Sequence, residues 1–468
     1  MTIAAATLLA GVGLWATPVT AAQAPGVDGA PGIGDPYWPL DGNGGYDVTR
    51  YRIDNTWSFA QRRLRGATSI DLVATQDLAS LSLDFLLPVI GVSVDGAPAR
   101  FHREGRGHEL RVRPAVPLVA GQAYTVRVRY AGHPGPKRYA GGSSWLQRPG
   151  EVVTMGEPHM ASWWFPANDH PTDKALMDVR ITVPKGQKAI SNGRLVSRIP
   201  RGRSVTWRWR AGEPMAPYLA FFAAGDFTIQ RGTYRGLRWV NAVSRKLDKP
   251  AQTRALRSLR RSASIVRWLE RDLGPYPFAV TGGVVTAIDT GFALENQTRP
   301  TYPYVGGDMA SLVVHEQAHQ WFGDDIAVRR WRDIWLNEGF ASFMEWRWGE
   351  EKWDWDPQRR LLRSWRLIPT SSHFWKVPIA DPGPSDVFDW AVYERGAMTL
   401  QALRHRIGDD TFFALLREWA TQRPGPDATV EEFEELASLR AGVDLTDFFD
   451  AWLRTPRRPA RTVANGLA

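Results

Sequence analysis

Two histidines and two glutamates have the types and spacing of a zinc-dependent hydrolase. His315 and His319 are four residues apart, so on a helix both imidazoles lie on one face, one turn apart, and can reach one ion. Glu316 can serve as a general base beside that ion. Glu338, on a second predicted helix, supplies the third ligand. Because three protein ligands leave a fourth position for water, we expect one catalytic Zn²⁺ per chain.

The residues that flank the two histidines are apolar, so the helix is expected to be largely buried. Buried imidazoles and carboxylates need a partner, because unpaired buried polar groups destabilise the fold, and a metal supplies one. The alternative, a chance run of polar residues on a solvated helix, is disfavoured by these neighbours: Leu312, Val313, Val314, Trp321 and Phe322.

The composition excludes some classes of protein. The 468 residues are enough for two or three domains, and the absence of cysteine excludes a disulfide framework and thiolate ligands without fixing the compartment. The formal net charge is +9, with the arginines scattered. They alternate with tryptophan in the stretch Trp207-Arg208-Trp209-Arg210, which is typical of a strand with one buried and one solvated face. We therefore predict no nucleic-acid binding.

The N-terminus indicates export. Residues 2–22 carry no charge, and Ala22-Gln23-Ala24 has the small-x-small form of a signal-peptidase site. We expect residues 1–24 to be a signal peptide and the protein to be secreted or associated with the cell envelope. The alternative is an apolar tail or an uncleaved anchor, since a positive n-region is missing. Elsewhere no segment approaches a membrane-spanning length, so stable membrane insertion is not expected.

The rest of the chain divides by its hydrophobic period. Residues 25–45 are dense in Gly, Pro and Asp and predict a flexible or extended linker. Strand-like alternation then runs over 46–233 and indicates an antiparallel β domain. Helical spacing dominates 234–455, with a short sheet around Gly282–Asn296. Residues 456–468 predict a loosely ordered basic tail.

The segment Trp335–Ala341 and its distance from His319 resemble the aminopeptidase N family of zinc peptidases, which also includes the leukotriene epoxide hydrolase. The resemblance implies an N-terminal antiparallel β domain followed by a thermolysin-like, mainly helical zinc catalytic domain. The supporting motifs occur in the family's order: Tyr46-Asp47-Val48, Glu157-Pro158, Phe165-Pro166, His315–Gly323 and Tyr393–Ala397.

The resemblance implies a role for each matching residue. His315, His319 and Glu338 would bind zinc. Glu316 would be the base that takes a proton from the zinc-bound water, and Tyr393 would donate a hydrogen bond to the tetrahedral oxyanion. Tyr393 by itself would more often be a packed core tyrosine; the following Glu-Arg-Gly sequence favours the catalytic role.

A second set of residues would bind the substrate. Glu295 would hold the free α-amine, Ala293 would offer backbone hydrogen bonds, and Asn296 ends the same motif. Glu157 would be a second anchor for the amine, or alternatively a cap or an ion-pair partner within the β domain. A carboxylate at a fixed distance from zinc positions only the first peptide bond, so we expect peptides with a free N-terminus as substrates.

Two residues depart from the family's Gly-x-Met-Glu-Asn motif. Leu294 replaces the methionine, which should alter the pocket only modestly. Phe292 replaces the glycine and could restrict the approach of the substrate to the backbone, unless Gly291 takes over. We also expect the short family form, a monomer without the helical C-terminal domain and with a more open cleft.

Outside the motifs, Glu345 lies seven residues after Glu338 and hence on the same helical face. It could orient a ligand histidine or form a surface ion pair, and Asp324 or Asp325 could orient the histidine instead.

The leading interpretation is a zinc aminopeptidase, and two alternatives remain. The first is an endopeptidase or an epoxide hydrolase that uses the same zinc, and Glu295 argues against the endopeptidase. The second is a catalytically silent envelope-binding protein, which the complete set of ligands, base and tyrosine disfavours.

Overall fold

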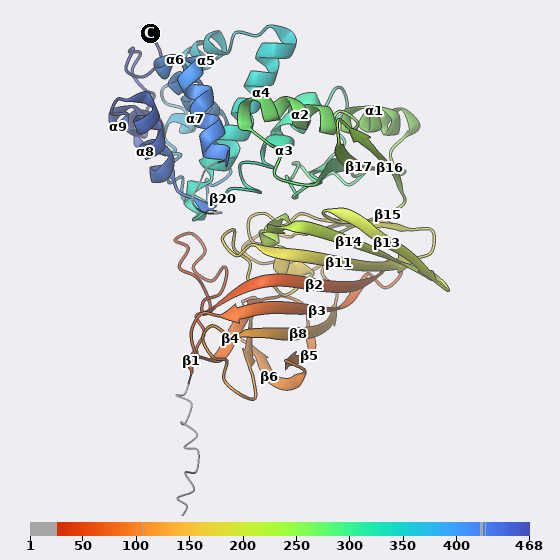
Figure 1. Ribbon diagram of the computed structural model, residues 1–468. Coiled ribbons are helices and arrows are strands. Elements are labelled where there is room, and N and C mark those ends of the chain that lie inside the picture. The colour runs from red at the N-terminus through yellow and green to blue at the C-terminus, as the bar shows by residue number, and fades with distance from the viewer. Residues whose placement is uncertain (1–25, 106, 422–424, 426) are drawn as a thin grey trace, which may run out of the picture.

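The computed structural model describes residues 26–105, 107–421, 425 and 427–468, and the predicted signal peptide lies outside them. Figure 1 shows two parts in contact, a β domain and a mainly helical domain. Among the described residues, no helix is both long enough and apolar enough to cross a membrane.

A large twisted sheet dominates the β domain, with the strand order β1-β4-β7-β6-β5-β8-β3-β2-β11-β14-β13. Its strands alternate buried and exposed positions, as the sequence predicts. The strands are β1 (Val27–Asp28), β2 (Tyr46–Ser58), β3 (Arg63–Ala74), β4 (Leu78–Asp84), β5 (Val89–Val94), β6 (Ala97–Arg103), β7 (Glu109–Arg113), β8 (Ala123–Gly132), β11 (Ala175–Pro184), β13 (Arg194–Arg201) and β14 (Ser204–Met215).

The sheet is not purely antiparallel, because β1 pairs with β4 and β2 pairs with β11 in parallel. A smaller sheet has the order β12-β15-β10-β9. Its strands are β9 (Trp145–Arg148), β10 (Glu151–Thr154), β12 (Lys188–Ile190) and β15 (Ala223–Gly225).

The second domain starts earlier than residue 234. Four strands form a sheet in the order β16 (Phe227–Tyr234), β17 (Leu237–Ser244), β18 (Val280–Val285) and β19 (Thr301–Tyr302), and β16 pairs directly with β17. The expected boundary at 233 therefore moves to about residue 226, because the alternation in β16 looks the same from sequence whichever sheet it joins. The short sheet predicted around Gly282–Asn296 is this one, with its strands on either side of the 286–300 loop.

Helices α1 to α9 build the rest of this domain (Figure 1). Asp308 accepts a hydrogen bond from the Ala310 backbone N–H at the start of α3, and Asp389 accepts one from Ala391 at the start of α6. The helices are α1 (Lys249–Leu259), α2 (Ser262–Leu273), α3 (Ala310–Ala318), α4 (Trp335–Trp353), α5 (Pro357–Leu367), α6 (Trp390–Ile407), α7 (Asp409–Thr421), α8 (Val430–Ala441) and α9 (Thr446–Phe449). A short parallel pair, β20 (Ala327–Val328) with β21 (Asp427–Ala428), connects the start of α8 to the loop between α3 and α4.

Two segments that the sequence predicts to be loose are packed. In residues 26–45, Asp35 accepts a hydrogen bond at 2.9 Å from the backbone N–H of Trp331, so this segment joins the two domains rather than forming a free linker. In the tail, the backbone oxygen of Pro459 accepts a hydrogen bond from the Trp365 indole, and Leu467 is buried. The expectation of a loosely ordered tail is wrong, because its contacts come from distant helices that composition does not reveal.

Candidate active site

Helices α3 and α4 bring the three predicted ligands together. His315 Nε2 lies 3.1 Å from His319 Nε2 and 3.3 Å from a carboxylate oxygen of Glu338, and His319 Nε2 lies 3.2 Å from that same oxygen. All three side chains are buried. Helical spacing places the two histidines one turn apart, and the contact between α3 and α4 adds the glutamate.

These ligand atoms fit a zinc ion. Two imidazole nitrogens and one carboxylate oxygen converge on a point in a buried site, which is the donor set of a catalytic zinc. Burial alone would raise the pKa of Glu338, but the neighbouring His319 and His315 lower it to about 2. Burial likewise opposes charge on His319, yet the Glu338 and Glu295 carboxylates raise its pKa to about 9. The site therefore concentrates negative charge where a cation would bind.

A hydrogen bond fixes the outer nitrogen of each imidazole. Glu345 lies 2.8 Å from Nδ1 of His315, and the backbone oxygen of Phe322 lies 3.0 Å from Nδ1 of His319. An acceptor at Nδ1 leaves the Nε2 lone pair free for a metal. Of the two alternatives for Glu345, the structure shows the contact with a ligand histidine. Asp324 and Asp325 do not take that role; instead their backbone oxygens accept hydrogen bonds from Lys174 of the β domain.

Glu316 and Tyr393 flank the ligand set. Glu316 is buried, and that burial raises its pKa to about 8, although His315 and His319 oppose the shift. Tyr393 comes from α6, and its ring lies parallel to that of His315 with centroids 6.1 Å apart. Burial, followed by the charge of Glu338, raises the pKa of Tyr393 far above its ordinary value, so the phenol stays protonated and can donate a hydrogen bond.

The predicted amine anchors, Glu157 and Glu295, line the same cavity as the three ligands. Burial raises the pKa of both carboxyl groups, and Glu295 adds to the shift at Glu157. Tyr218 donates a hydrogen bond to Glu295 at 3.4 Å, and the Gln320 side chain donates to the Glu295 backbone oxygen at 2.9 Å. One Glu157 oxygen is buried and has no hydrogen-bond partner among the described residues. An ammonium group placed between Glu157 and Glu295 would relieve both buried charges.

The other residues of the motif around Glu295 fall into two groups, those that line the cavity and Asn296, which does not. Ala293 and Phe292 line the cavity, and Phe292 is half-exposed. Gly291, with φ +78°, adopts the left-handed conformation that precedes the motif. Asn296 does not line the cavity; it is fully buried behind it and donates to the Leu219 backbone oxygen at 3.1 Å. This hydrogen bond links the motif to the segment that carries Tyr218.

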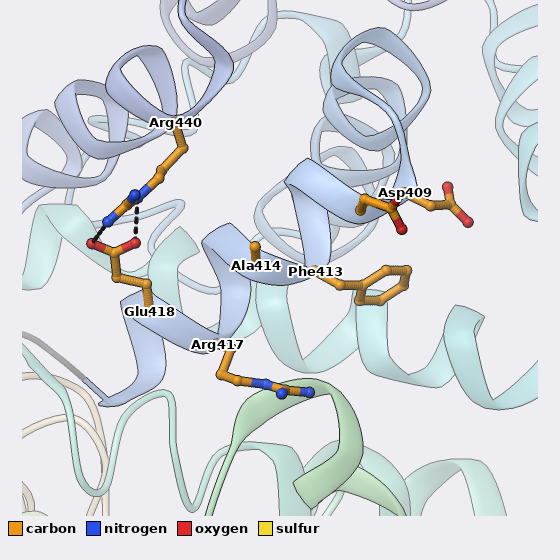
Figure 2. A pocket seen from close by; sticks show the side chains of 7 residues that line it. Asp409, Phe413, Ala414, Arg417, Glu418 and Arg440 are labelled. Atoms are coloured by element: carbon orange, nitrogen blue, oxygen red, sulfur yellow. Dashed lines mark hydrogen bonds and ion pairs between the residues drawn. The ribbon is translucent and has the colours of Figure 1, made fainter.

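The cavity that contains all these groups has a volume of about 620 Å³. Away from the polar groups its wall is apolar and is formed by Met160, Phe292, Leu312 and Phe388. A second hollow lies on α7 and α8, where Figure 2 shows Glu418 and Arg440 paired with each other. Asp409 and Asp410 line it at the start of α7, and Asp409 pairs with Arg404. No histidine of the described residues lines this hollow, so it offers no comparable metal site.

Sequence reasoning missed Tyr218 and Gln320. Gln320 directly follows a ligand histidine, so its position on the zinc helix was a usable signal. Tyr218 lies in a short helical turn of the β domain, 77 residues before the glutamate it contacts. Only the packing of the two domains reveals that contact.

Comparisons with known proteins agree with this geometry. Residues 282–452 match the Peptidase family M1 domain, and residues 48–219 match the Peptidase M1 N-terminal domain. A crystal structure of an M1 zinc metallopeptidase mutant from Deinococcus radiodurans, bound to a Tyr-Ser-Ala substrate, is 25% identical with a TM-score of 0.79, covering 92% of this chain and 99% of that one.

Curated relatives are longer than this chain. The leucyl aminopeptidase of Saccharolobus solfataricus is 24% identical over 88% of this chain and 54% of its own length. Endoplasmic reticulum aminopeptidase 1 of Rattus norvegicus is 27% identical over 67% of this chain and 36% of its own length. The chain thus spans between about a third and a half of the curated relatives it matches.

Proposed function

This chain belongs to peptidase family M1, and on that premise we propose that it is a zinc-dependent aminopeptidase that removes the N-terminal residue of peptides. The observation that carries the proposal is the arrangement of one cavity. It is lined both by the ligand set His315, His319 and Glu338 and by the carboxylates of Glu295 and Glu157. An endopeptidase has no need of buried anions that face its metal site.

A zinc ion bound by the three ligands would polarise the scissile carbonyl and lower the pKa of a water molecule to near neutrality. Glu316 is the proton carrier of the site. Its raised pKa suits a group that accepts a proton from the attacking water and then delivers it to the leaving amine. Tyr393 donates a hydrogen bond to the substrate carbonyl oxygen as negative charge develops there, which stabilises the transition state more than the ground state.

Substrate selection depends on the two amine anchors. An α-ammonium group that pairs with Glu295 and Glu157 fixes the distance from the N-terminus to the ligand set, so only the first peptide bond reaches the reacting centre. Tyr218 orients Glu295 through its hydroxyl group. We also propose that the protein is secreted, because residues 2–22 are uncharged and mostly apolar.

The test compares a panel of aminoacyl fluorogenic amides and short peptides with their N-acetylated forms. We expect turnover of the free-amine substrates only, and a loss of about 10²- to 10⁴-fold in kcat for Glu316→Gln with zinc content retained. Glu350→Gln on α4, whose glutamate pairs with Arg404 away from the cavity, is the matched control. Equal turnover of acetylated peptides would establish an endopeptidase instead. Zinc binding without turnover of any substrate would support a silent envelope-binding protein, and turnover of epoxides alone would support the hydrolase.

A further inference from the structure

The β domain contains a second buried cluster of metal-binding side chains, far from the ligands on α3 and α4. We propose that Asp84, His108 and Glu109, with Asp41 beside them, bind a second divalent transition-metal ion of the zinc class, with a structural role. Asp41 comes from the interdomain segment, Asp84 ends β4, Glu109 opens β7, and His108 directly precedes it. This site is independent of the proposed peptidase activity.

Three of these side chains, those of Asp84, His108 and Glu109, bring ligand atoms within 4.8 Å of one another, and Asp41 lies beside them. His108 Nε2 lies 2.9 Å from Oδ1 of Asp84, 3.6 Å from Oε1 of Glu109 and 3.9 Å from Oδ1 of Asp41. Ligand atoms about 2.0–2.2 Å from a tetrahedral zinc ion lie roughly 3–3.6 Å from one another. The distances from His108 to Asp84 and Glu109 thus resemble those of the catalytic ligand set, which are 3.1–3.3 Å, whereas Asp41 lies farther out.

The oxygens that face this centre accept no hydrogen bonds from the described residues. They are Oδ1 of Asp41, Oδ1 of Asp84 and both oxygens of Glu109, and all three side chains are at least 96% buried. The opposite oxygens of the two aspartates are occupied. Oδ2 of Asp84 accepts from the Asn43 side chain at 3.1 Å and from a backbone N–H at 2.7 Å, and Oδ2 of Asp41 contacts His159. Each aspartate therefore has one oxygen held by protein and one free for a cation.

The strand register places two carboxyl groups side by side, and they can both be ionised only if a cation lies between them. Asp84 and Glu109 are directly opposite on the antiparallel strands β4 and β7, where like charges destabilise a sheet. Asp169 adds a third buried carboxylate with a free oxygen, and Asp41 a fourth. Among the described residues, the basic side chains within ion-pair distance of these carboxylates are two imidazoles, His108 and His159. Buried anions in such excess are unstable unless a cation or protons neutralise them.

The donor set determines the class of ion. Imidazole nitrogen combined with carboxylate oxygens suits zinc and neighbouring transition metals, whereas calcium and magnesium prefer oxygen ligands alone. The three ligands are buried, and Asp41 Oδ1, which lies 3.9 Å from His108 Nε2, is a further donor for the fourth position. A site that protein ligands close in this way is the pattern of a structural ion.

The position of the cluster explains what such an ion would stabilise. Asp41 lies in the segment that joins the domains, and Trp38 of this segment packs edge-on against His159 and Trp331 with ring centroids 4.6 Å and 5.7 Å away. His159 is two residues from Glu157, the proposed second amine anchor. A bound ion would therefore fasten the interdomain segment to the turn that presents Glu157 to the cavity.

Metal counting on the full chain tests the proposal. After dialysis against a weak chelator, plasma mass spectrometry should find two equivalents of zinc in the wild type and one in the His315→Ala/His319→Ala chain. The Asp84→Asn/Glu109→Gln chain should also keep one equivalent and melt at a lower temperature than the wild type. Glu104→Gln is the matched control, because this glutamate lies on the same hairpin and pairs with Arg111 outside the cluster; it should keep two.

The opposite results are equally definite. Amides imitate protonated carboxyl groups, so if protons rather than metal neutralise the cluster, Asp84→Asn/Glu109→Gln will keep the wild-type zinc content and melt at the same or a higher temperature. If this variant fails to fold, the His315→Ala/His319→Ala chain still decides: zero zinc in that folded chain overturns the proposal. If zinc is bound at the second site but not at His315 and His319, the wild type and the His315→Ala/His319→Ala chain will each contain one equivalent.

Discussion

Glu345 lies 2.8 Å from Nδ1 of His315, so the other ring nitrogen of this histidine is directed at Glu338 and His319. The carboxylate and its histidine lie on different helices, α4 and α3, and Glu345 is two turns beyond the ligand Glu338 on α4. One helix thus supplies both a ligand and the group that orients another ligand. This arrangement fixes the tautomer of His315 before any metal binds.

Removal of the Glu345 carboxylate should weaken zinc binding rather than the chemical step. We expect Glu345→Ala to lower zinc affinity about 10- to 100-fold, measured by competition with a chromogenic chelator. Activity at saturating zinc should recover most of its wild-type value. Glu345→Gln should restore part of the affinity, because its amide oxygen still accepts from Nδ1. An affinity unchanged in both variants would contradict an orienting role.

Glu295 and Tyr218 should differ in the size of their effect on substrate binding. We expect Glu295→Gln to reduce kcat/KM by about 2–3 kcal/mol, roughly 30- to 150-fold, because it leaves the substrate ammonium without its charge partner. Tyr218→Phe removes one long hydrogen bond, of 3.4 Å, to that carboxylate, so only about 1 kcal/mol is expected. Steady-state kinetics on one free-amine substrate measures both. A larger effect for Tyr218→Phe would assign the anchoring role elsewhere.

Phe292 should shape the pocket for the first side chain of the substrate. Its half-exposed ring joins Met160, Leu312 and Phe388 in an apolar wall, so we expect a preference for apolar N-terminal residues. Loss of half a buried ring corresponds to about 1 kcal/mol, or roughly fivefold in kcat/KM for leucyl and phenylalanyl substrates. Phe292→Ala and Phe292→Gly should behave alike if only the ring matters. A rate gain on all substrates in the glycine variant alone would instead show that the backbone limits substrate approach.

The sequence predicted the chemistry of the site better than its surroundings. His315, His319 and Glu338 could be paired from helical spacing and a known motif, because the ligands of one ion are constrained in type and distance. The family resemblance also predicted that Glu295 and Tyr393 belong to this site, and both line the cavity. Local patterns cannot show that Asn296 is turned away from substrate, since that depends on its contact with Leu219 in the other domain.

The fold shows the same division between local and long-range information. Alternation along β14 correctly placed Trp207 and Trp209 inside, with Arg208 and Arg210 outside and paired to Asp178. The same alternation could not tell which sheet β16 joins, so the domain boundary was misplaced. The packing of the tail and of residues 26–45 depends on partners hundreds of residues away, as in the hydrogen bond from Trp331 to Asp35.

Asp333 should make stability depend on pH near the start of α4. Burial raises the pKa of Asp333 to about 6, although Arg330 opposes the shift. A carboxyl that binds its proton more tightly when folded contributes stability that is fully present below about pH 4 and is lost as pH rises through about 6. A shift of about two units corresponds to roughly 3 kcal/mol. In urea titrations from pH 4 to 7, Asp333→Asn should therefore gain stability relative to the wild type, while Asp410→Asn on the surface should not.

Two facing glycines set the distance between the helices that carry Glu338 and Tyr393. A Cβ atom on Gly396 of α6 would lie 2.6 Å from the Cα of Gly339 on α4, which is closer than atoms can approach. Gly339 directly follows the ligand Glu338, and Gly396 is one helical turn beyond Tyr393. We expect Gly396→Ala to force α6 away from α4, to destabilise the fold by about 1–3 kcal/mol, and to move the phenol from the reacting carbonyl. The phenol of Tyr393 makes its hydrogen bond in the transition state, so its displacement should lower kcat more than it raises KM.

Kinetics and thermal unfolding of Gly396→Ala measure both effects. His405→Ala, on the exposed face of the same helix, is the control. Wild-type kcat in the glycine variant would mean that the α4–α6 distance does not control the position of Tyr393.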